Sequence, residues 1–138
     1  MNFKPVFHVI AWLLGVVALL MGGCGLVSAL YGEPAVAWTA LVYAAAGTLA
    51  VAAVLGALTR NDQELSRRDG LGVVAFGWLC AGVAGAVPYL LSGVIASPMA
   101  ALFESVSGLT TTGASVIPVL EGVPKGILLW RALTHLVG

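Results

Sequence analysis

Long apolar runs, separated by short polar segments, dominate the N-terminal part of the chain. They cover residues 6–30, 36–58 and 71–91, and each reaches the length of about 20 residues at which a helix crosses the bilayer's hydrocarbon core. The pattern predicts three transmembrane helices, the first two forming a hairpin within residues 1–58. The first run exceeds the apolar core of a secretory signal, roughly 7–15 residues, so we expect it to be retained as a helix.

The polar segment at residues 59–70 separates this hairpin from the third run. It carries three of the chain's six basic residues, and Lys4 precedes the first run. Because Lys and Arg are concentrated on the cytoplasmic side of membrane proteins, we expect both the N-terminus and this loop to be cytoplasmic. The third span then runs outward. Tyr31 and Tyr89 are expected near the outer interface, where aromatic rings with a polar end are enriched.

A fourth helical segment, residues 98–109, is too short to cross the membrane. Ser97 is a favourable N-cap and Pro98 suits the first helical position. The helix would be about 17 Å long at roughly 1.5 Å per residue. Irregular backbone at mid-membrane depth has to be surrounded by protein or by a water-filled cavity. The pattern therefore predicts a half-helix that leads into a pore.

The segment after this half-helix, residues 110–115, is short, non-helical and rich in β-branched and small residues. Its members are Thr110, Thr111, Thr112, Gly113, Ala114 and Ser115. Gly113 permits torsions that other residues resist, so successive carbonyl groups can face one axis. Such rings of carbonyls replace the hydration shell of potassium in selectivity filters, and the negative end of the half-helix dipole favours a cation. We expect residues 110–114 to form an ion site, with potassium bound by the backbone of residues 111–113. The alternative is an ordinary Thr-rich turn.

After a return segment, a further apolar helix starts at about residue 125 and heads inward to residue 138. Outward helix, half-helix, filter and inward helix together make a first pore unit over residues 71–138. The fold class predicted from the sequence is therefore an all-α membrane protein. It has two N-terminal transmembrane helices followed by one helix–pore-loop–helix unit, whose last helix is expected to be truncated.

Composition and charge exclude several other classes of protein. Hydrophobic residues make up 60% of the chain and charged residues 9%, whereas soluble domains have about 25% charged residues. The formal net charge is zero, so no nucleic-acid-binding surface is expected. The sequence has no nucleophile–base motif and no metal-ligand cluster, so we expect neither an enzyme nor a bound cofactor. Cys24 and Cys80 lie within apolar runs and are expected to be packing residues.

Polar side chains near the predicted filter are candidates for supporting it. Glu104 is either a buried carboxylate that braces the filter or adds negative potential to the pore, or a surface residue in a wet crevice. Ser105 and Ser107 are expected to hydrogen-bond to the backbone of the half-helix or filter. Arg131 lies about 9 Å into the last helix. A charge at this depth is a candidate for a functional site, but the long side chain could also reach the membrane interface. A further alternative is an ion pair with Glu104 or with sequence outside this chain. His135 is expected to be a packing residue.

Residues 103–114, FESVSGLTTTGA, resemble the pore-helix and filter signature of the Trk/Ktr potassium transporter family. Residues 68–70 ahead of the third span, Pro88 near its end, and residues 127–138 extend the similarity over essentially the whole chain. The two helices that precede the pore unit resemble the TrkH type of membrane subunit more than the shorter Ktr type.

The resemblance implies a fold in which four pore units of one polypeptide surround a single ion path. This chain would then be an N-terminal fragment that holds one of them. The resemblance also implies potassium as the transported substrate, the bacterial cytoplasmic (inner) membrane as the location, and a homodimeric assembly in the bilayer. A cytosolic nucleotide-binding regulatory subunit is the further partner that it implies.

The function expected from the sequence is potassium uptake through a carbonyl-lined selectivity filter. The alternative is a small integral-membrane scaffold or assembly subunit that does not transport ions. A homotetrameric channel built from this pore unit is disfavoured by the short last helix.

Overall fold

The chain folds as an all-α protein, as the sequence predicts. The computed structural model describes residues 3–59 and 67–138, and within them it has five α-helices and no strand. These helices are α1 (Phe3–Leu30), α2 (Ala35–Leu58), α3 (Arg67–Leu91), α4 (Pro98–Leu109) and α5 (Lys125–Val137). Residues 60–66 of the expected cytoplasmic loop, Arg60 among them, lie outside the described residues.

Three of these helices are long and apolar enough to cross a membrane. The candidate spans are Lys4–Leu30, Ala35–Leu58 and Asp69–Leu91, and each exceeds the length of about 20 residues that a spanning helix needs. Helix α4 has 12 residues, which corresponds to roughly 18 Å and covers little more than half of the hydrocarbon thickness. The chain is therefore a multi-pass membrane protein that also contains a half-length helix.

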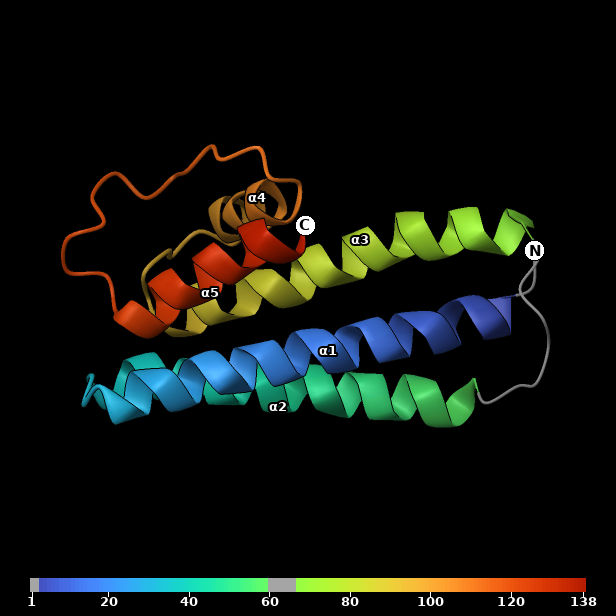
Figure 1. Ribbon diagram of the computed structural model, residues 1–138, viewed down its shortest axis with the longest axis horizontal. Coiled ribbons are helices and arrows are strands. Elements are labelled where there is room, and N and C mark those ends of the chain that lie inside the picture. The colour runs from blue at the N-terminus through green and yellow to red at the C-terminus, as the bar shows by residue number, and fades with distance from the viewer. Residues whose placement is uncertain (1–2, 60–66) are drawn as a thin grey trace.

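The three long helices lie beside one another, and the two short helices pack together at one end of this layer (Figure 1). Helices α1 and α2 run antiparallel and are joined by a tight turn, in which Gly32 has a φ of 69°. Helices α4 and α5 lie against the half of α3 that ends at Leu91, and α4 is seen nearly end-on in this view. Because α5 contacts all four other helices, it connects the hairpin to α4 and to the segment that follows it.

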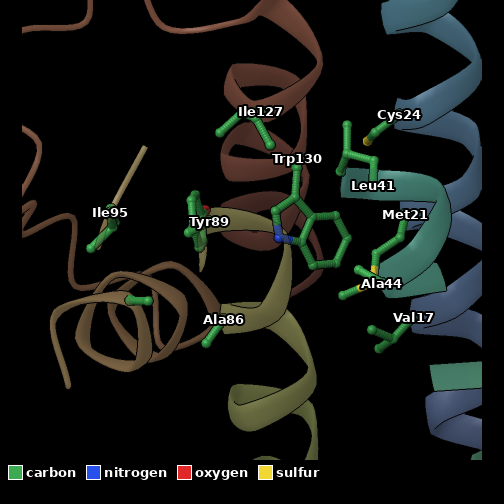
Figure 2. Close-up of a cluster of buried hydrophobic side chains, with 11 residues drawn as sticks. Val17, Met21, Cys24, Leu41, Ala44, Ala86, Tyr89, Ile95, Ile127 and Trp130 are labelled. Carbon is green, nitrogen blue, oxygen red and sulfur yellow. The ribbon is translucent and has the colours of Figure 1, made fainter. Parts of the chain in front are cut away.

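Trp130 of α5 lies in the main hydrophobic core, between α1 and α3 (Figure 2). It is 2% exposed, and its indole N–H donates to the carbonyl oxygen of Gly85 at 3.1 Å, which gives this buried polar group its partner. Other buried members of the core are Val17, Met21, Cys24, Leu41, Ala44, Ala86, Tyr89, Ile95, Ala101 and Ile127. They come from all five helices and, at Ile95, from the loop before α4, so the hairpin shares one core with α4 and α5.

Tyr89, which was expected near the outer interface, is enclosed by protein and not exposed at the end of α3. Tyr89 is 0% exposed and belongs to the core, because α4 and α5 cover this end of α3. The expectation treated the helix as if only lipid surrounded it. Tyr31, in contrast, is 64% exposed, and the ammonium of Lys125 lies 4.6 Å from the centre of its ring.

Candidate functional site

Helix α4 places the candidate filter against α5. At its start, the hydroxyl oxygen of Ser97 accepts a hydrogen bond from the backbone N–H of Ala100 at 3.5 Å, and Pro98 opens the helix. Near its end, Gly108 faces Thr134 of α5 so closely that an added Cβ would lie 2.4 Å from the threonine Oγ1. Glycine at this position therefore permits the close approach of the two helices.

The end of α4 is closed by two backbone hydrogen bonds. The N–H of Thr111 donates to the carbonyl of Gly108 at 2.9 Å, and the N–H of Thr112 donates to the carbonyl of Ser107 at 3.0 Å. This is the Schellman pattern, in which the residue after the helix cap adopts a left-handed conformation and is usually glycine. Here that residue is Thr111, with a φ of 55°. A β-branched residue in this region of torsion space is uncommon and strained.

Left-handed torsions alternate along the filter segment. Thr111 has a φ of 55° and Gly113 a φ of 77°, whereas Thr112 between them has no positive φ. Such alternation in the sign of φ differs from regular helix and strand, in which φ stays negative. The carbonyl oxygens of residues 111–113 accept no hydrogen bond from any described residue, and the three residues are exposed. These three oxygens are available to a cation.

The carbonyl groups on either side are engaged within the protein. The Ser107 hydroxyl donates to the carbonyl oxygen of Ala114 at 2.6 Å, and the Thr111 hydroxyl donates to that of Thr110 at 2.7 Å. The Thr110 hydroxyl also lies 2.8 Å from that of Thr112. Five residues were expected to form the ion site. Three of them have carbonyl oxygens that accept no hydrogen bond from the described residues, and the carbonyl oxygens of the other two accept hydrogen bonds within the protein.

Glu104 holds the segment that follows the filter. Its side chain is 1% exposed, which excludes a place in a wet crevice in this structure. The carboxylate accepts hydrogen bonds from the Ser115 hydroxyl, at 3.0 Å to each oxygen, and from the backbone N–H of Val116 at 2.8 Å. One buried carboxylate therefore ties the middle of α4 to the chain leaving the filter.

Arg131 of α5 provides the positive partner of this carboxylate. Its Nε lies 2.8 Å from Oε1 of Glu104, and its side chain is 23% exposed. A buried carboxylate is costly unless it is paired and hydrogen-bonded, and this one is both. His135 does not join the network through its ring, because its Nδ1 makes a hydrogen bond of 2.8 Å to the carbonyl oxygen of Arg131 within α5.

The structure separates the two serines that were expected to support the filter. The Ser107 hydroxyl donates to the carbonyl of Ala114 in the candidate filter, but the Ser105 hydroxyl is buried and has no hydrogen-bond partner among the described residues. Ser105 faces α3 instead, where an added Cβ on Gly85 would lie 2.4 Å from its Oγ. The expected hydrogen-bonding role of Ser105 is therefore not seen, because the side chain points away from the filter.

Glu33, in the turn between α1 and α2, is a residue that sequence reasoning missed. Its carboxylate accepts hydrogen bonds from the backbone N–H groups of Lys125 and Gly126, the latter at 3.1 Å, and from the Ser28 hydroxyl at 2.5 Å. Partial burial alone raises the pKa of Glu33, but the bonds from Ser28 and the α5 amides, with the charge of Lys125, lower the pKa below its usual value. The one hint in the sequence is Pro124 at the N-cap position of α5. It has no side chain that could cap the helix, so a capping group has to come from elsewhere.

Sequence comparisons relate the chain to cation transporters. The family model described as TrkH, cation transport protein, matches residues 39–138. The chain is 35% identical to the Trk system potassium uptake protein TrkH of Halomonas elongata over 140 aligned residues, which cover 100% of this chain and 29% of that protein. It is 34% identical to the protein of the same name from Escherichia coli K12, over 96% of this chain and 28% of that protein.

The fold agrees with a solved structure. The crystal structure of the potassium transporter TrkH from Vibrio parahaemolyticus matches with a TM-score of 0.91 and 33% sequence identity, over 99% of this chain and 29% of that chain. The chain thus spans less than a third of the length of these relatives. Since the family model covers well over half of the residues, this chain belongs to the TrkH family of cation transport proteins.

Proposed function

We propose that this chain contributes one pore unit to a potassium uptake transporter of the bacterial cytoplasmic membrane. The observation that carries the proposal is the backbone of residues 111–113. Positive φ angles at Thr111 and Gly113 accompany three successive carbonyl oxygens that have no donor among the described residues. A row of such oxygens replaces the water shell of a dehydrated cation. The names of the relatives, potassium uptake proteins, support potassium as that cation.

The half-helix supports the same proposal. Helix α4 has 12 residues, so its C-terminal end would lie near the middle of a bilayer of roughly 30 Å. The negative end of the helix dipole would then lie beside the filter and favour a cation over an anion. Non-helical backbone at that depth is tolerated where it lines a water-filled path.

Side chains around the filter have a positioning role in this proposal. Ser107 fixes the carbonyl of Ala114, and Glu104 fixes Ser115 and the amide of Val116. Arg131 holds Glu104 in turn. The chain directly after the three free carbonyls is therefore anchored, which would keep the carbonyl oxygens from closing around an ion smaller than potassium. None of these side chains needs to touch the ion.

The exposed face of α4 indicates where the rest of the protein would pack. Met99, Phe103 and Val106 are 74%, 49% and 41% exposed, although they lie on the same helix as the buried Glu104. Three further pore units of the full-length chain would cover this face around a common ion path. That arrangement, like a homodimer and a cytosolic nucleotide-binding regulatory subunit, is proposed from the family resemblance.

The proposed orientation has the N-terminus in the cytoplasm. Lys4 of α1 and Arg67 and Arg68 at the start of α3 belong to the same end of the bundle, where α1 and α3 begin (Figure 1), and basic residues favour the cytoplasmic side. The α1–α2 turn, with Glu33, and the start of α5 then face outward. The lipid bilayer would surround the remaining apolar surface.

Complementation and selectivity measurements test the proposal. The full-length protein should restore growth of potassium-uptake-deficient bacteria at low external potassium. In proteoliposomes, Gly113→Ser should lower the potassium-to-sodium permeability ratio, because a side chain at a φ of 77° disturbs the carbonyl alignment. If the chain instead belongs to a scaffold without transport, no uptake would be restored, and a bulky residue at position 113 would affect folding no more than changes elsewhere.

A further inference from the structure

The N-terminus of α5 is capped by a residue from a distant part of the chain. The first amides of a helix have no partner within it, and Pro124, at the cap position of α5, makes no side-chain hydrogen bond to them. Glu33 accepts the amides of Lys125 and Gly126 from sequence separations of 92 and 93 residues. The carboxylate also suits the positive end of the helix dipole.

Three further contacts fix this junction. The Ser28 hydroxyl donates to Glu33 at 2.5 Å, which orients the carboxylate. Gly126 is packed so closely against α1 that an added Cβ would lie 2.5 Å from the Cβ of Ser28. The ammonium of Lys125 lies 4.6 Å from the centre of the Tyr31 ring, within the range of a cation–π interaction. The α1–α2 turn therefore holds the first turn of α5 through several different types of contact.

The same short helix carries Arg131, which pairs with Glu104 behind the filter. Lys125 and Arg131 are roughly 9 Å apart along the helix axis. A helix of 13 residues moves largely as one body, so a shift of its first turn displaces Arg131 as well. The chain of contacts runs from Glu33 through α5 to Arg131 and Glu104, and from there to Ser115.

We propose that Glu33 is a positioning residue for ion selection, through which the N-terminal hairpin holds α5 and keeps Arg131 in place against Glu104. The inference rests on the proposed function of the filter. Glu33 does not contact the filter; it acts through α5. The hairpin is then part of the selectivity apparatus as well as a membrane anchor.

The test compares Glu33→Ala and Glu33→Gln with a matched control in the full-length protein. Glu121→Gln removes the same charge from the exposed loop before α5, where the carboxylate makes no hydrogen bond or ion pair with the described residues. Both Glu33 variants should lower the potassium-to-sodium permeability ratio in proteoliposomes by about threefold to tenfold, with the larger loss in Glu33→Ala. Glu33→Asp should recover part of the ratio, and Glu121→Gln should leave it unchanged.

A double variant tests the route through α5. If Glu33 acts through Arg131, adding Glu33→Ala to Arg131→Met should cause little further loss of selectivity, whereas independent effects would multiply. Unchanged selectivity in both Glu33 variants, with a clear loss in Gly113→Ser, would overturn the inference and leave the filter assignment intact. If Gly113→Ser also left selectivity unchanged, both the inference about Glu33 and the filter assignment would be overturned. Failure of both Glu33 variants to accumulate would show a role in folding alone and would also overturn the inference.

Discussion

Glu104 and Arg131 are 27 positions apart in the sequence, and their side chains meet with 2.8 Å between Oε1 and Nε. The pair joins the half-helix α4 to α5. The same carboxylate binds the hydroxyl of Ser115 and the amide of Val116. A single ion pair thus links two helices to the chain that follows the proposed filter, and we expect that loosening it changes selectivity as well as stability.

Glu104→Gln should weaken this junction. The substitution leaves the partly buried Arg131 without a counterion and replaces one acceptor oxygen by a donor. We expect the free energy of unfolding of the full-length protein in detergent to fall by about 2–3 kcal/mol, together with the potassium-to-sodium permeability ratio. Glu121→Gln serves as the control and should change neither quantity. Wild-type selectivity in the Glu104 variant would contradict the bracing role.

Ser107→Ala and Ser105→Ala form a matched pair on the same helix. Ser107 donates to the Ala114 carbonyl at 2.6 Å, so its removal should cost about 1 kcal/mol of stability and reduce selectivity. The Ser105 hydroxyl is buried without a partner among the described residues, so Ser105→Ala should be neutral or slightly stabilising. Chemical denaturation and sodium competition of potassium uptake measure the two effects. Equal losses in the two variants would contradict the assignment.

Gly85→Ala should be destabilising alone and tolerated together with Ser105→Ala. An added Cβ would lie 2.4 Å from Ser105 Oγ, but 3.6 Å from the nearest atoms after it, so removing the hydroxyl removes the clash. We expect the single variant to lose about 1–2 kcal/mol of unfolding free energy and the double variant to regain most of it. Additive losses in the double-mutant cycle would mean that α3 and α4 do not pack in this way.

The stability contributed by Glu33 should depend on pH in a defined direction. Because its pKa in the folded protein lies below the usual value of 4.5, the contribution is fully present above that value and is lost as pH falls through the lower, folded-state pKa. The difference in melting temperature between wild type and Glu33→Gln should therefore be largest near neutral pH and narrow under acid conditions. A difference that widens on acidification would contradict the capping geometry.

Much of the fold was predictable because each helix has a local signal. The apolar runs predict the three long helices. Ser97 and Pro98 predict the start of α4, and the helix begins at Pro98 in the structure. The burial of Tyr89 could not be predicted, because it depends on α4 and α5 covering α3, which no local pattern reports.

The details of the site depend on contacts between distant residues. Glu104 and Arg131 were recognisable as unusual charges, but whether they meet is decided by how α4 and α5 pack. The cap that Glu33 provides spans 92 positions and has no counterpart in the local sequence. The left-handed Thr111 was also missed, because the rule for helix ends favours glycine there and the only glycine in the segment is Gly113.

Locating the bound ion in a crystal tests directly whether the backbone oxygens of residues 111–113 coordinate potassium. Crystals of the full-length protein grown with thallium or rubidium in place of potassium should show anomalous density within coordination distance of the backbone oxygens of Thr111, Thr112 and Gly113. If no anomalous density appears there, or if it lies at side chains such as Glu104, these backbone oxygens do not form the ion site.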